Sequence, residues 1–478
     1  MNGPHAQALP EVSWKVPASC VPSLVNEWLG PTEWNCSAPL PSSRRVAIVS
    51  SRLPRLLAPN DPWLTGLRAV MDQNHEADFS TVVAEGAAGW ELVFRCAIRH
   101  EIPVICFHFP PQNRKNVASW LSEEFDGFKS HAGCVIHAWA MNPAKSLSDV
   151  EPINPEVATM PMPDRAALAW ADEIVVLRLR SGGNLHRLLS MRLRCADAIV
   201  RFVDLPHLQS RKARGELIGL GARLWQPPQL TSRCLIPQSE ISNLKSEISN
   251  LKSPLPCPSA DGWDFLTHTT RACPGPWPGQ SREDFLDSLL DARPDADHSP
   301  LAALSRIIAE RRLRASNRTI RGKFPVVSFT AVPLAELPRL RTFRSHRARW
   351  DFEPYGIAIR REWLEHLGAR PVVYGDGPLW ERLPVTDRPF FQLLRRTPTV
   401  QPFNRSTIQP SPIDWSRERE WRVLGDVDLS RATAEQVIVF VPSETEAQRL
   451  AKLCPWPIKI LGPNSLYPFR ADTAVASE

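Results

Sequence analysis

The chain has 478 residues, of which 43% are apolar and 23% charged, with a formal net charge of +6. This length exceeds one ordinary hydrophobic core, so we expect roughly two or three domains. The composition is that of a globular protein and excludes a fibrous or fully disordered chain, and the modest positive charge permits nucleic-acid binding without requiring it.

Cysteine spacing and hydropathy limit the metal, redox and membrane possibilities. The ten cysteines include no Cys-x-x-Cys pair and no paired Cys/His spacing, so no metal site is predicted. No basic N-terminal segment precedes an apolar core, and no apolar run approaches membrane-spanning length. We therefore expect a cytoplasmic protein that has no signal peptide, no membrane partner and no cofactor.

Residues 1–43 are rich in Pro, Trp and Ser and are predicted to form an N-terminal arm that packs on the body. Residues 44–225 then alternate between apolar strand-like runs and helix-like segments. Alternation of this kind predicts an α/β domain with a Rossmann-like parallel sheet. The expected strands are residues 44–51, 81–84, 102–107, 131–140, 172–177 and 198–203. The expected helices are 62–73, 90–100, 165–171 and a segment that follows residues 178–186 and ends at residue 194.

Three loops poor in large side chains follow predicted strands of this domain. Ligands of open α/β sheets bind at the carboxyl ends of the strands, and a helix N-terminus favours an anion. The loops therefore predict a nucleotide or phosphate site, with a tight structural turn as the alternative at each loop. The predicted ligand-binding residues are Ser50, Ser51 and Arg52 in the first loop, Glu85, Gly86 and Gly89 in the second, and Arg180, Ser181, Gly182 and Gly183 in the third.

Three motifs of this domain resemble known families. VAIVSSR (46–52) and VVLRLRSGGNLHRLL (175–189) are similar to segments of the DNA-processing protein A (Smf) family, and AEGAAGWELV (84–93) resembles the glycine loop of the SLOG superfamily, which includes the Lonely Guy phosphoribohydrolases. The resemblance implies a nucleotide-binding or DNA-binding domain. Glu91 is a loose counterpart of the Lonely Guy glutamate, which implies a general base or a ribose-hydroxyl acceptor at that position.

Residues 226–280 are rich in proline and are predicted to be a low-complexity linker. They contain a tandem repeat, SEISNLK, over residues 239–252. Two heptads are too few to sustain a coiled coil alone, so a duplication in an unconstrained loop is the favoured interpretation. Residues 281–319 read as a helical connector that ends in an arginine-rich stretch, which is either a solvated helix end or a phosphate-binding patch.

Residues 320–465 are predicted to form a second, α+β domain, followed by a tail over residues 466–478. Its SFT (328–330), YGIAI (355–359), PVVY (371–374) and EREWR (418–422) motifs resemble, in that order, motifs of AbiGi-type abortive-infection proteins. The resemblance implies a link to phage defence without naming a reaction.

Glu418, Glu420 and Arg422 alternate along a predicted strand, which would place their side chains on one face. They form either a paired-carboxylate catalytic site, in which one carboxyl has a raised pKa, or a surface ion-pair ladder. Ser328, Thr330, Arg347 and Tyr355 are candidates to join this site.

Taken together, these patterns predict a sensor or effector that binds a nucleotide or nucleotide-derived signal and acts in bacterial phage defence or stress. A homo-oligomer is compatible with this prediction. A DNA-binding protein of the DNA-processing protein A type is the first alternative, and a hydrolase of nucleotide N-glycosidic bonds is the second.

Overall fold

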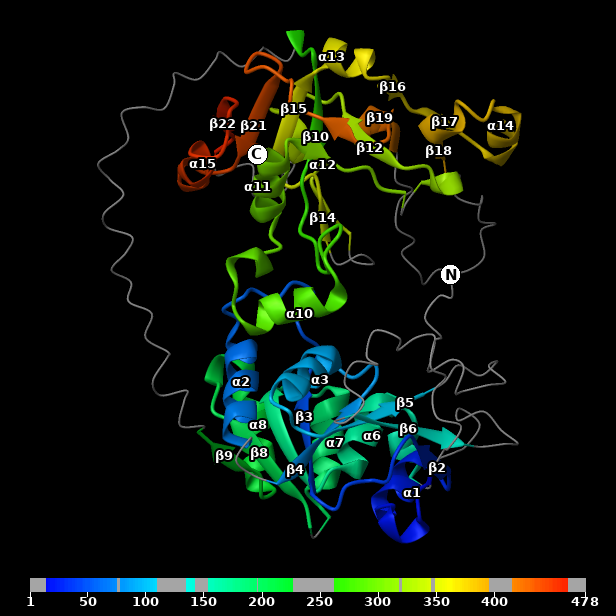
Figure 1. Ribbon diagram of the computed structural model, residues 1–478, viewed down its shortest axis with the longest axis vertical. Coiled ribbons are helices and arrows are strands. Elements are labelled where there is room, and N and C mark those ends of the chain that lie inside the picture. Colours follow the sequence, from blue (N-terminus) through cyan, green and yellow to red (C-terminus); the bar gives the residue numbers. More distant parts are fainter. Residues whose placement is uncertain are drawn as a thin grey trace, which may run out of the picture. The chain divides into compact units, whose positions relative to one another are not determined.

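The computed structural model describes residues 14–74, 78–109, 135–141, 154–195, 197–226, 262–317, 320–344, 349–394 and 415–462 (Figure 1). The chain divides into two compact units. Unit 1 comprises residues 1–238 and 275–297, and unit 2 comprises residues 239–274 and 298–478. No helix in the described ranges is long and apolar enough to cross a membrane.

Unit 1 contains a nine-stranded sheet in the order β1-β2-β6-β5-β4-β3-β7-β8-β9. All neighbours from β6 to β9 are parallel, whereas β1 and β2 join the β6 edge in antiparallel fashion. The predicted Rossmann-like parallel sheet is thus confirmed. The strands are β1 (Trp14–Lys15), β2 (Glu33–Cys36), β3 (Arg44–Ser50), β4 (Phe79–Ala84), β5 (Val104–His108), β6 (Val135–Met141), β7 (Glu173–Arg178), β8 (Ile199–Val203) and β9 (Arg223–Trp225).

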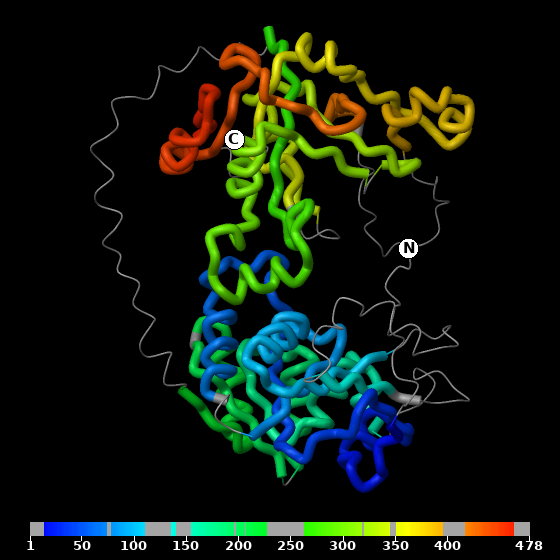
Figure 2. The backbone as a smooth tube through the Cα atoms, viewed as in Figure 1, coloured from blue at the N-terminus to red at the C-terminus, as the bar shows by residue number. Residues whose placement is uncertain are grey.

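Helices cover both faces of this sheet because the buried strands are apolar on both sides. On β3, for example, Val46 and Ile48 pack with α2, α3 and α10, whereas Ala47 and Val49 pack with the helices of the opposite face. The first group is α2 (Pro62–Asn74), α3 (Trp90–Arg99) and α10 (Arg282–Leu290), and the second is α1 (Ser23–Leu29), α5 (Pro155–Ala158), α6 (Met162–Trp170), α7 (Asn184–Arg192) and α8 (Arg211–Gly219). Figure 2 shows α10, far away in the sequence, lying over α2 and α3.

The order of the strands creates a crossover point in the middle of the sheet. From β3 the chain moves outward through β4 and β5, and it later returns to β7 on the other side of β3. The helix after β3 lies on one face of the sheet and the helix after β7 lies on the other. Open α/β sheets bind ligands at such a point, so the loops after β3 and β7 are where a site is expected.

The N-terminal segment is part of the unit 1 core. Its strand β2 pairs with β6, and the ring of Trp34 meets the rings of Phe107 and Trp170 edge-on, with both centroid distances 5.4 Å. Trp28 and Trp34 are buried, whereas Trp14 is half exposed. Burial of these large aromatic surfaces holds the segment against the sheet.

Unit 2 contains a seven-stranded, mainly antiparallel sheet in the order β16-β19-β12-β10-β15-β21-β22. Its strands are β10 (Phe265–Thr269), β12 (Val326–Thr330), β15 (Gly356–Arg360), β16 (Arg370–Pro371), β19 (Glu420–Leu424), β21 (Val437–Val441) and β22 (Ile458–Ile460). Small two-stranded pairs add β11 (Arg312–Leu313), β13 (Thr342–Arg344), β14 (Arg349–Asp351), β17 (Val373–Gly375), β18 (Phe391–Leu393) and β20 (Val427–Asp428). The predicted α+β class is confirmed.

The helices of unit 2 are α11 (Pro300–Glu310), α12 (Leu337–Leu340), α13 (Arg361–His366), α14 (Gly377–Arg382) and α15 (Glu444–Ala451). Helix α15 begins with a capping box, in which the Ser443 hydroxyl accepts from the Glu446 amide and donates to the Glu446 carboxylate. Six short 3-10 turns complete the described elements: Ala18–Cys20, Pro206–Leu208, Pro294–Ala296, Arg321–Lys323, Arg388–Phe390 and Trp415–Glu418.

The stretch predicted as a linker, residues 226–280, contains a strand of the unit 2 sheet. Strand β10 pairs with β15 over its whole length, from Phe265 opposite Arg360 to Thr269 opposite Gly356. The SEISNLK repeat lies outside the described residues. The structure therefore differs from the prediction at residues 265–269, where five residues between proline-rich stretches form a central strand.

Candidate functional site

The loop after β3 is tied to the loop after β7 by hydrogen bonds. The Ser51 amide donates to the Arg178 carbonyl at 2.8 Å, and the Arg180 amide donates to the Ser51 hydroxyl at 3.0 Å. The Ser50 hydroxyl accepts from the Trp63 indole at 3.1 Å and donates to the Ser51 carbonyl. Two of the predicted loops thus lie side by side, but the hydroxyl groups of Ser50 and Ser51 already form hydrogen bonds within the protein.

The loop after β4 is a compact turn built on two glycines in the left-handed region. Gly86 has φ +88° and Gly89 has φ +78°, where a side chain would be strained. A Cβ at Gly89 would lie 2.9 Å from the Trp63 ring, so this position is also closed by packing. The loop is therefore a tight turn, and the predicted role of Gly86 and Gly89 in ligand binding stays a prediction.

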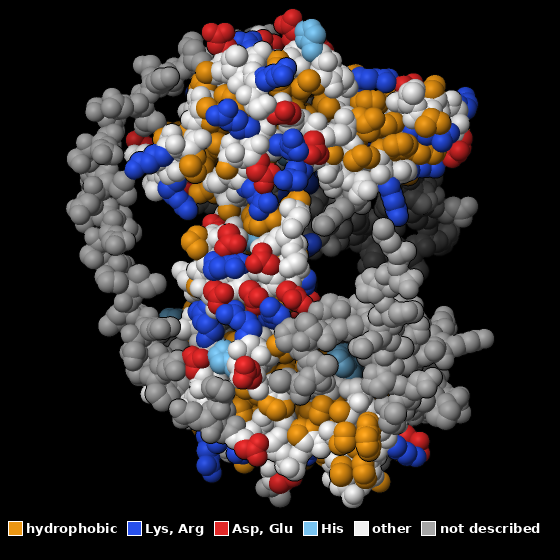
Figure 3. Space-filling model, viewed as in Figure 1, with side chains coloured by type: hydrophobic (Ala, Val, Ile, Leu, Met, Phe, Trp, Pro, Cys, Tyr) orange, Lys and Arg blue, Asp and Glu red, His pale blue; other side chains and the backbone are white. Residues whose placement is uncertain are grey.

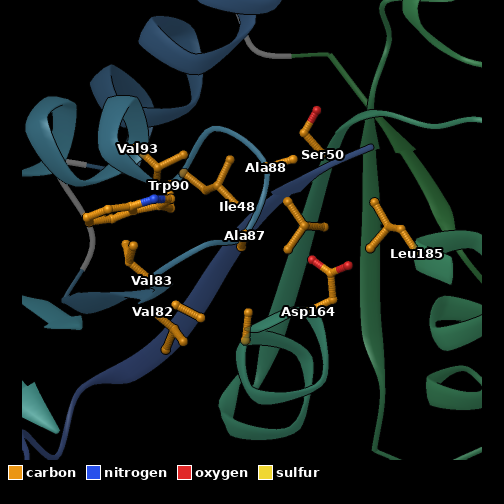
Figure 4. Close-up of a pocket in the computed structure, with 13 residues that line it drawn as sticks. Ile48, Ser50, Val82, Val83, Ala87, Ala88, Trp90, Val93, Asp164 and Leu185 are labelled. Carbon is orange, nitrogen blue, oxygen red and sulfur yellow. The ribbon is translucent and has the colours of Figure 1, made fainter. Parts of the chain in front are cut away.

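The cavity beside this loop is small, about 20 Å³, which is room for one water molecule. Figure 4 shows Ser50 at the end of β3, Ala87 and Ala88 in the loop, and Asp164 reaching the same space from α6. Burial raises the pKa of Asp164 to about 6. At neutral pH a carboxylate therefore lines the space, and it repels an anion placed there.

Glu85 belongs to a partly buried network with two histidines. Its carboxylate lies 3.0 Å from His108 Nδ1, and His108 Nε2 lies 2.9 Å from His137 Nδ1. The His108 side chain is fully buried, and burial together with His108 lowers the pKa of His137 to about 4. Through His108 and His137, Glu85 therefore links the ends of β4 and β5 to β6, and sequence reasoning missed this network.

The loop after β7 is the most open of the three. Arg180, Ser181 and Gly182 are exposed, and a Cβ at Gly182 would meet nothing within 4 Å. The Gly182 amide donates to His186 Nδ1 at 3.2 Å, which closes the turn into α7. Gly183 is the N-cap of that helix and supplies no side-chain cap, so its first turn keeps backbone donors for another group.

Three arginines flank this open loop: Arg52 after β3, Arg178 at the end of β7, and Arg180. Arg52 and Arg180 are exposed and Arg178 is partly exposed. Within the described residues, none of the three guanidinium groups pairs with a carboxylate. The strand register, in which Ser50 lies opposite Arg178, brings all three residues to one short stretch of the sheet edge.

Glu91 lies in the first turn of α3 and forms an ion pair with Arg282 of α10. Arg95 and Arg99 of the same helix bind Asp287 of α10 and Asp291, the C-cap residue of α10. Figure 3 shows acidic and basic side chains side by side over this region. Glu91 is thus one member of an ion-pair row between two helices. Its predicted role as a base stays a prediction.

In unit 2, a larger cavity of about 530 Å³ is lined by residues of the neighbouring central strands β10 and β12. The two strands pair only at Thr267 and Thr330, and residues of both line the cavity. The His268 ring bridges the two strands, with Nδ1 donating to the Ser328 carbonyl at 2.9 Å. Burial lowers the pKa of His268, so the ring is neutral at pH 7.

Glu420 and Arg422 lie on β19 at one wall of this cavity. Arg422 is buried and donates to both Glu420 oxygens, to Gln392 Oε1, and to the carbonyls of Pro389 and Phe391. With five donors used, Arg422 has no N–H left for a ligand. It holds the Glu420 carboxylate in place.

Glu418 does not lie on the strand, and the prediction of strand alternation through this residue is wrong. The residue ends a 3-10 turn, and Arg419 between it and β19 has φ +46°. The Thr330 hydroxyl donates to the Glu418 carbonyl and holds the turn against β12. Nonetheless Glu418, Glu420 and Arg422 all line the same cavity.

The Glu418 carboxyl has no hydrogen-bond partner among the residues that the structure describes. Burial, and then the charges of Glu420 and Asp351, raise its pKa to about 7. Of the residues predicted to join this site, Ser328 and Thr330 line the cavity, whereas the Tyr355 hydroxyl donates to Glu446 and Arg347 lies outside the described residues. Sequence reasoning missed His268 and Thr267, because β10 was not predicted.

No protein-family model matches the chain, and no curated protein matches it. Among solved structures, DNA processing protein A from Streptococcus pneumoniae is 15% identical, with 47% of this chain and 76% of that chain covered and a TM-score of 0.31. DNA processing protein A from Helicobacter pylori, whose single-stranded DNA binding mode that structure describes, is 12% identical, with 44% and 90% covered and a TM-score of 0.30. At these identities and scores the likeness carries no inference about ligand or activity.

Proposed function

We propose that unit 1 binds the phosphate groups of a nucleic acid or nucleotide at the sheet edge between β3 and β7. The observation that carries the proposal is the group of Arg52, Arg178 and Arg180, which have no carboxylate partner in the described part of the chain. Guanidinium groups bind phosphate oxygens in pairs of parallel hydrogen bonds. The open Ser181–Gly182–Gly183 loop at the start of α7 adds backbone donors beside them.

Binding of a single-stranded nucleic acid on the surface is favoured over binding of a mononucleotide in an enclosed pocket. The cavity beside the neighbouring loop after β4, lined mainly by residues of β3, β4 and that loop, is about 20 Å³, whereas pockets for small ligands are usually several hundred Å³. Asp164 also places a carboxyl group in that cavity. A single-stranded nucleic acid needs only exposed donors along its backbone, so the DNA-binding alternative from the sequence becomes the preferred one.

Hydrolysis of an N-glycosidic bond receives less support. The residue proposed as the base, Glu91, forms its ion pair with Arg282, so its carboxylate is held by the fold. The role in phage defence remains a proposal that rests on the sequence resemblance of unit 2 alone. Plaque counts on cells with and without the chain test it, and equal counts over a broad panel of phages would remove it.

The binding proposal is tested with a fluorescently labelled oligo-dT strand of about 20 nucleotides. We expect its affinity to fall steeply with salt, with a slope of about −0.7 for each phosphate contacted. The triple variant R52A/R178A/R180A should weaken binding at least about tenfold and make the slope shallower by about 2. Arg223 is a matched control, because it is exposed at the start of β9, at the opposite edge of the same sheet.

The outcomes are distinct. If Arg223→Ala weakens binding as much as Arg180→Ala does, the effect is one of general charge and the site is not at this edge. A flat salt response, or an affinity that the triple variant leaves unchanged, would overturn the proposal. If AMP at micromolar concentration displaces the oligo-dT strand, a mononucleotide would again be the favoured ligand of this site.

A further inference from the structure

The cavity of unit 2 has the size and lining of a small-molecule site. Its volume of about 530 Å³ lies within the usual range for ligand pockets. Residues of the neighbouring strands β10 and β12 line it, and Ala303 and Ile307 of α11 add an apolar patch. A rigid sheet therefore presents both polar and apolar surface to one space.

Two polar groups in the lining have no partner in the described part of the chain. The Thr267 hydroxyl belongs to a side chain that is 1% exposed, and it makes no hydrogen bond there. The Glu418 carboxyl is likewise without a hydrogen bond among those residues. The Thr267 oxygen is buried in the sheet, whereas the Glu418 side chain is partly exposed and lines the cavity, so of the two groups Glu418 is the one open to a ligand or to water there.

Two arginines bring positive charge to the same cavity. The side chains of Arg271 and Arg314 are 41% and 44% exposed and both line it. Arg271 lies 3.8 Å from Asp351, which is a loose pair, and Arg314 uses its Nε for Glu310 at 2.9 Å. Each guanidinium group therefore keeps donors for an anion.

We propose that this cavity binds an anionic small molecule of nucleotide size, held by Arg271 and Arg314, and that Glu418 takes up a proton when the molecule binds. The proposal concerns unit 2 and does not rest on the function proposed for unit 1. The two guanidinium groups bind a phosphate or carboxylate group of the ligand. The apolar patch of α11 is available to contact the rest of the ligand.

The proton uptake follows from the charges around Glu418. Glu420 and Asp351 are the acidic groups that raise its pKa, whereas Arg344 and Arg271 lower it. Arg422 and Tyr374 also lie by Glu420, and His268 is neutral. An anionic ligand bound to Arg271 brings a negative charge near Glu418 and offsets the positive charge of Arg271. Both effects raise the pKa of Glu418, so its carboxyl favours the protonated form.

Calorimetric titration of the full chain with AMP at pH 8 tests the proposal, with adenosine as the uncharged counterpart and inorganic phosphate as the bare anion. The measurement is made in two non-phosphate buffers of different ionisation enthalpy, in a chain that carries R52A/R178A/R180A so that unit 1 does not contribute. We expect AMP to bind, adenosine to bind at least about tenfold more weakly, and between about half and one proton to be taken up.

Variants separate the roles of the residues. Glu418→Gln should abolish the proton uptake and keep AMP binding, and R271A/R314A should weaken AMP binding at least about tenfold. Glu365→Gln and Arg382→Ala are matched controls on exposed residues outside the lining and should change neither quantity. Absence of binding by AMP and phosphate at millimolar concentration, or proton uptake that persists in Glu418→Gln, would overturn the proposal.

Discussion

The guanidinium group of Arg422 binds both carboxylate oxygens of Glu420, two residues earlier on β19, with N–O distances of 2.9 and 3.1 Å. The two side chains are 1% and 16% exposed, so the pair is shielded from water. Because the other N–H groups of Arg422 donate to Gln392 and to two backbone carbonyls, Arg422 also holds β19 against the segment around β18. Its ionised carboxylate also raises the pKa of Glu418 beside it.

Removing one member of this pair should be costly. Arg422→Gln leaves a buried carboxylate without its partner, and we expect the free energy of unfolding to fall by about 3–5 kcal/mol in urea titrations. Lys15→Gln is the matched control, because its pair with Glu33 is exposed and its loss should cost less than about 1 kcal/mol. Equal small losses in both variants would show that the buried pair contributes little.

Asp164 should make the stability of unit 1 depend on pH. Its pKa is raised from 3.8 to about 6 in the folded chain, so the unfolded chain releases this proton more easily. Stability is therefore lost as the pH rises from about 4 to above 6, by on the order of 2–3 kcal/mol. Asp164→Asn removes this loss, so the variant should be more stable than the wild type at pH 7.5 and similar at pH 4. Thermal unfolding at the two pH values checks this, and an equal difference at both would contradict it.

Gly89 and Gly182 should respond differently to alanine. Both have positive φ, +78° and +71°, but a Cβ at Gly89 meets the Trp63 ring at 2.9 Å whereas one at Gly182 meets nothing. We expect Gly182→Ala to cost about 1 kcal/mol from backbone strain alone and Gly89→Ala to cost about 2–4 kcal/mol, since the ring must also move. Urea titration of the two variants measures the difference, and a larger loss at Gly182 would mean that the loop after β7 is the more constrained of the two.

The Glu91→Gln substitution should lower the stability of unit 1 slightly and leave its binding properties unchanged. The side chains of Glu91 and Arg282 are 33% and 43% exposed, and such pairs contribute less than about 1 kcal/mol. We therefore expect a small loss of stability and an unchanged affinity for the oligo-dT strand. A large loss of affinity, or loss of a nucleotide-hydrolysing activity that the wild type possesses, would restore Glu91 to the functional site.

Much of the fold follows from local patterns in the sequence. The predicted strand at residues 44–51 is β3, and the predicted helix at residues 62–73 is α2, because apolar periodicity and small-residue loops mark them clearly. Strand β10 was not predictable in this way. Its residues Phe265–Thr269 stand between proline-rich segments, and what fixes them as a strand is pairing with β15 and β12, which are distant in sequence.

The site was predictable to a lesser degree. Alternation suggested that Glu418, Glu420 and Arg422 share one environment, and they do line one cavity, but a left-handed residue at Arg419 rather than a strand brings Glu418 there. The hydrogen bonds that occupy Ser50, Ser51 and Glu85 depend on Trp63, Arg180 and His108. Such long-range partners leave no signal in the local sequence.

Hydrogen-exchange mass spectrometry with and without the oligo-dT strand tests whether nucleic acid binds between β3 and β7, because it reports which loop of unit 1 the nucleic acid covers. We predict slower exchange in peptides that contain residues 51–52 and 178–183, and unchanged exchange in the peptide that contains Gly86 and Gly89. Protection of the Gly86–Gly89 turn without protection of residues 178–183, or protection confined to unit 2, would contradict the account.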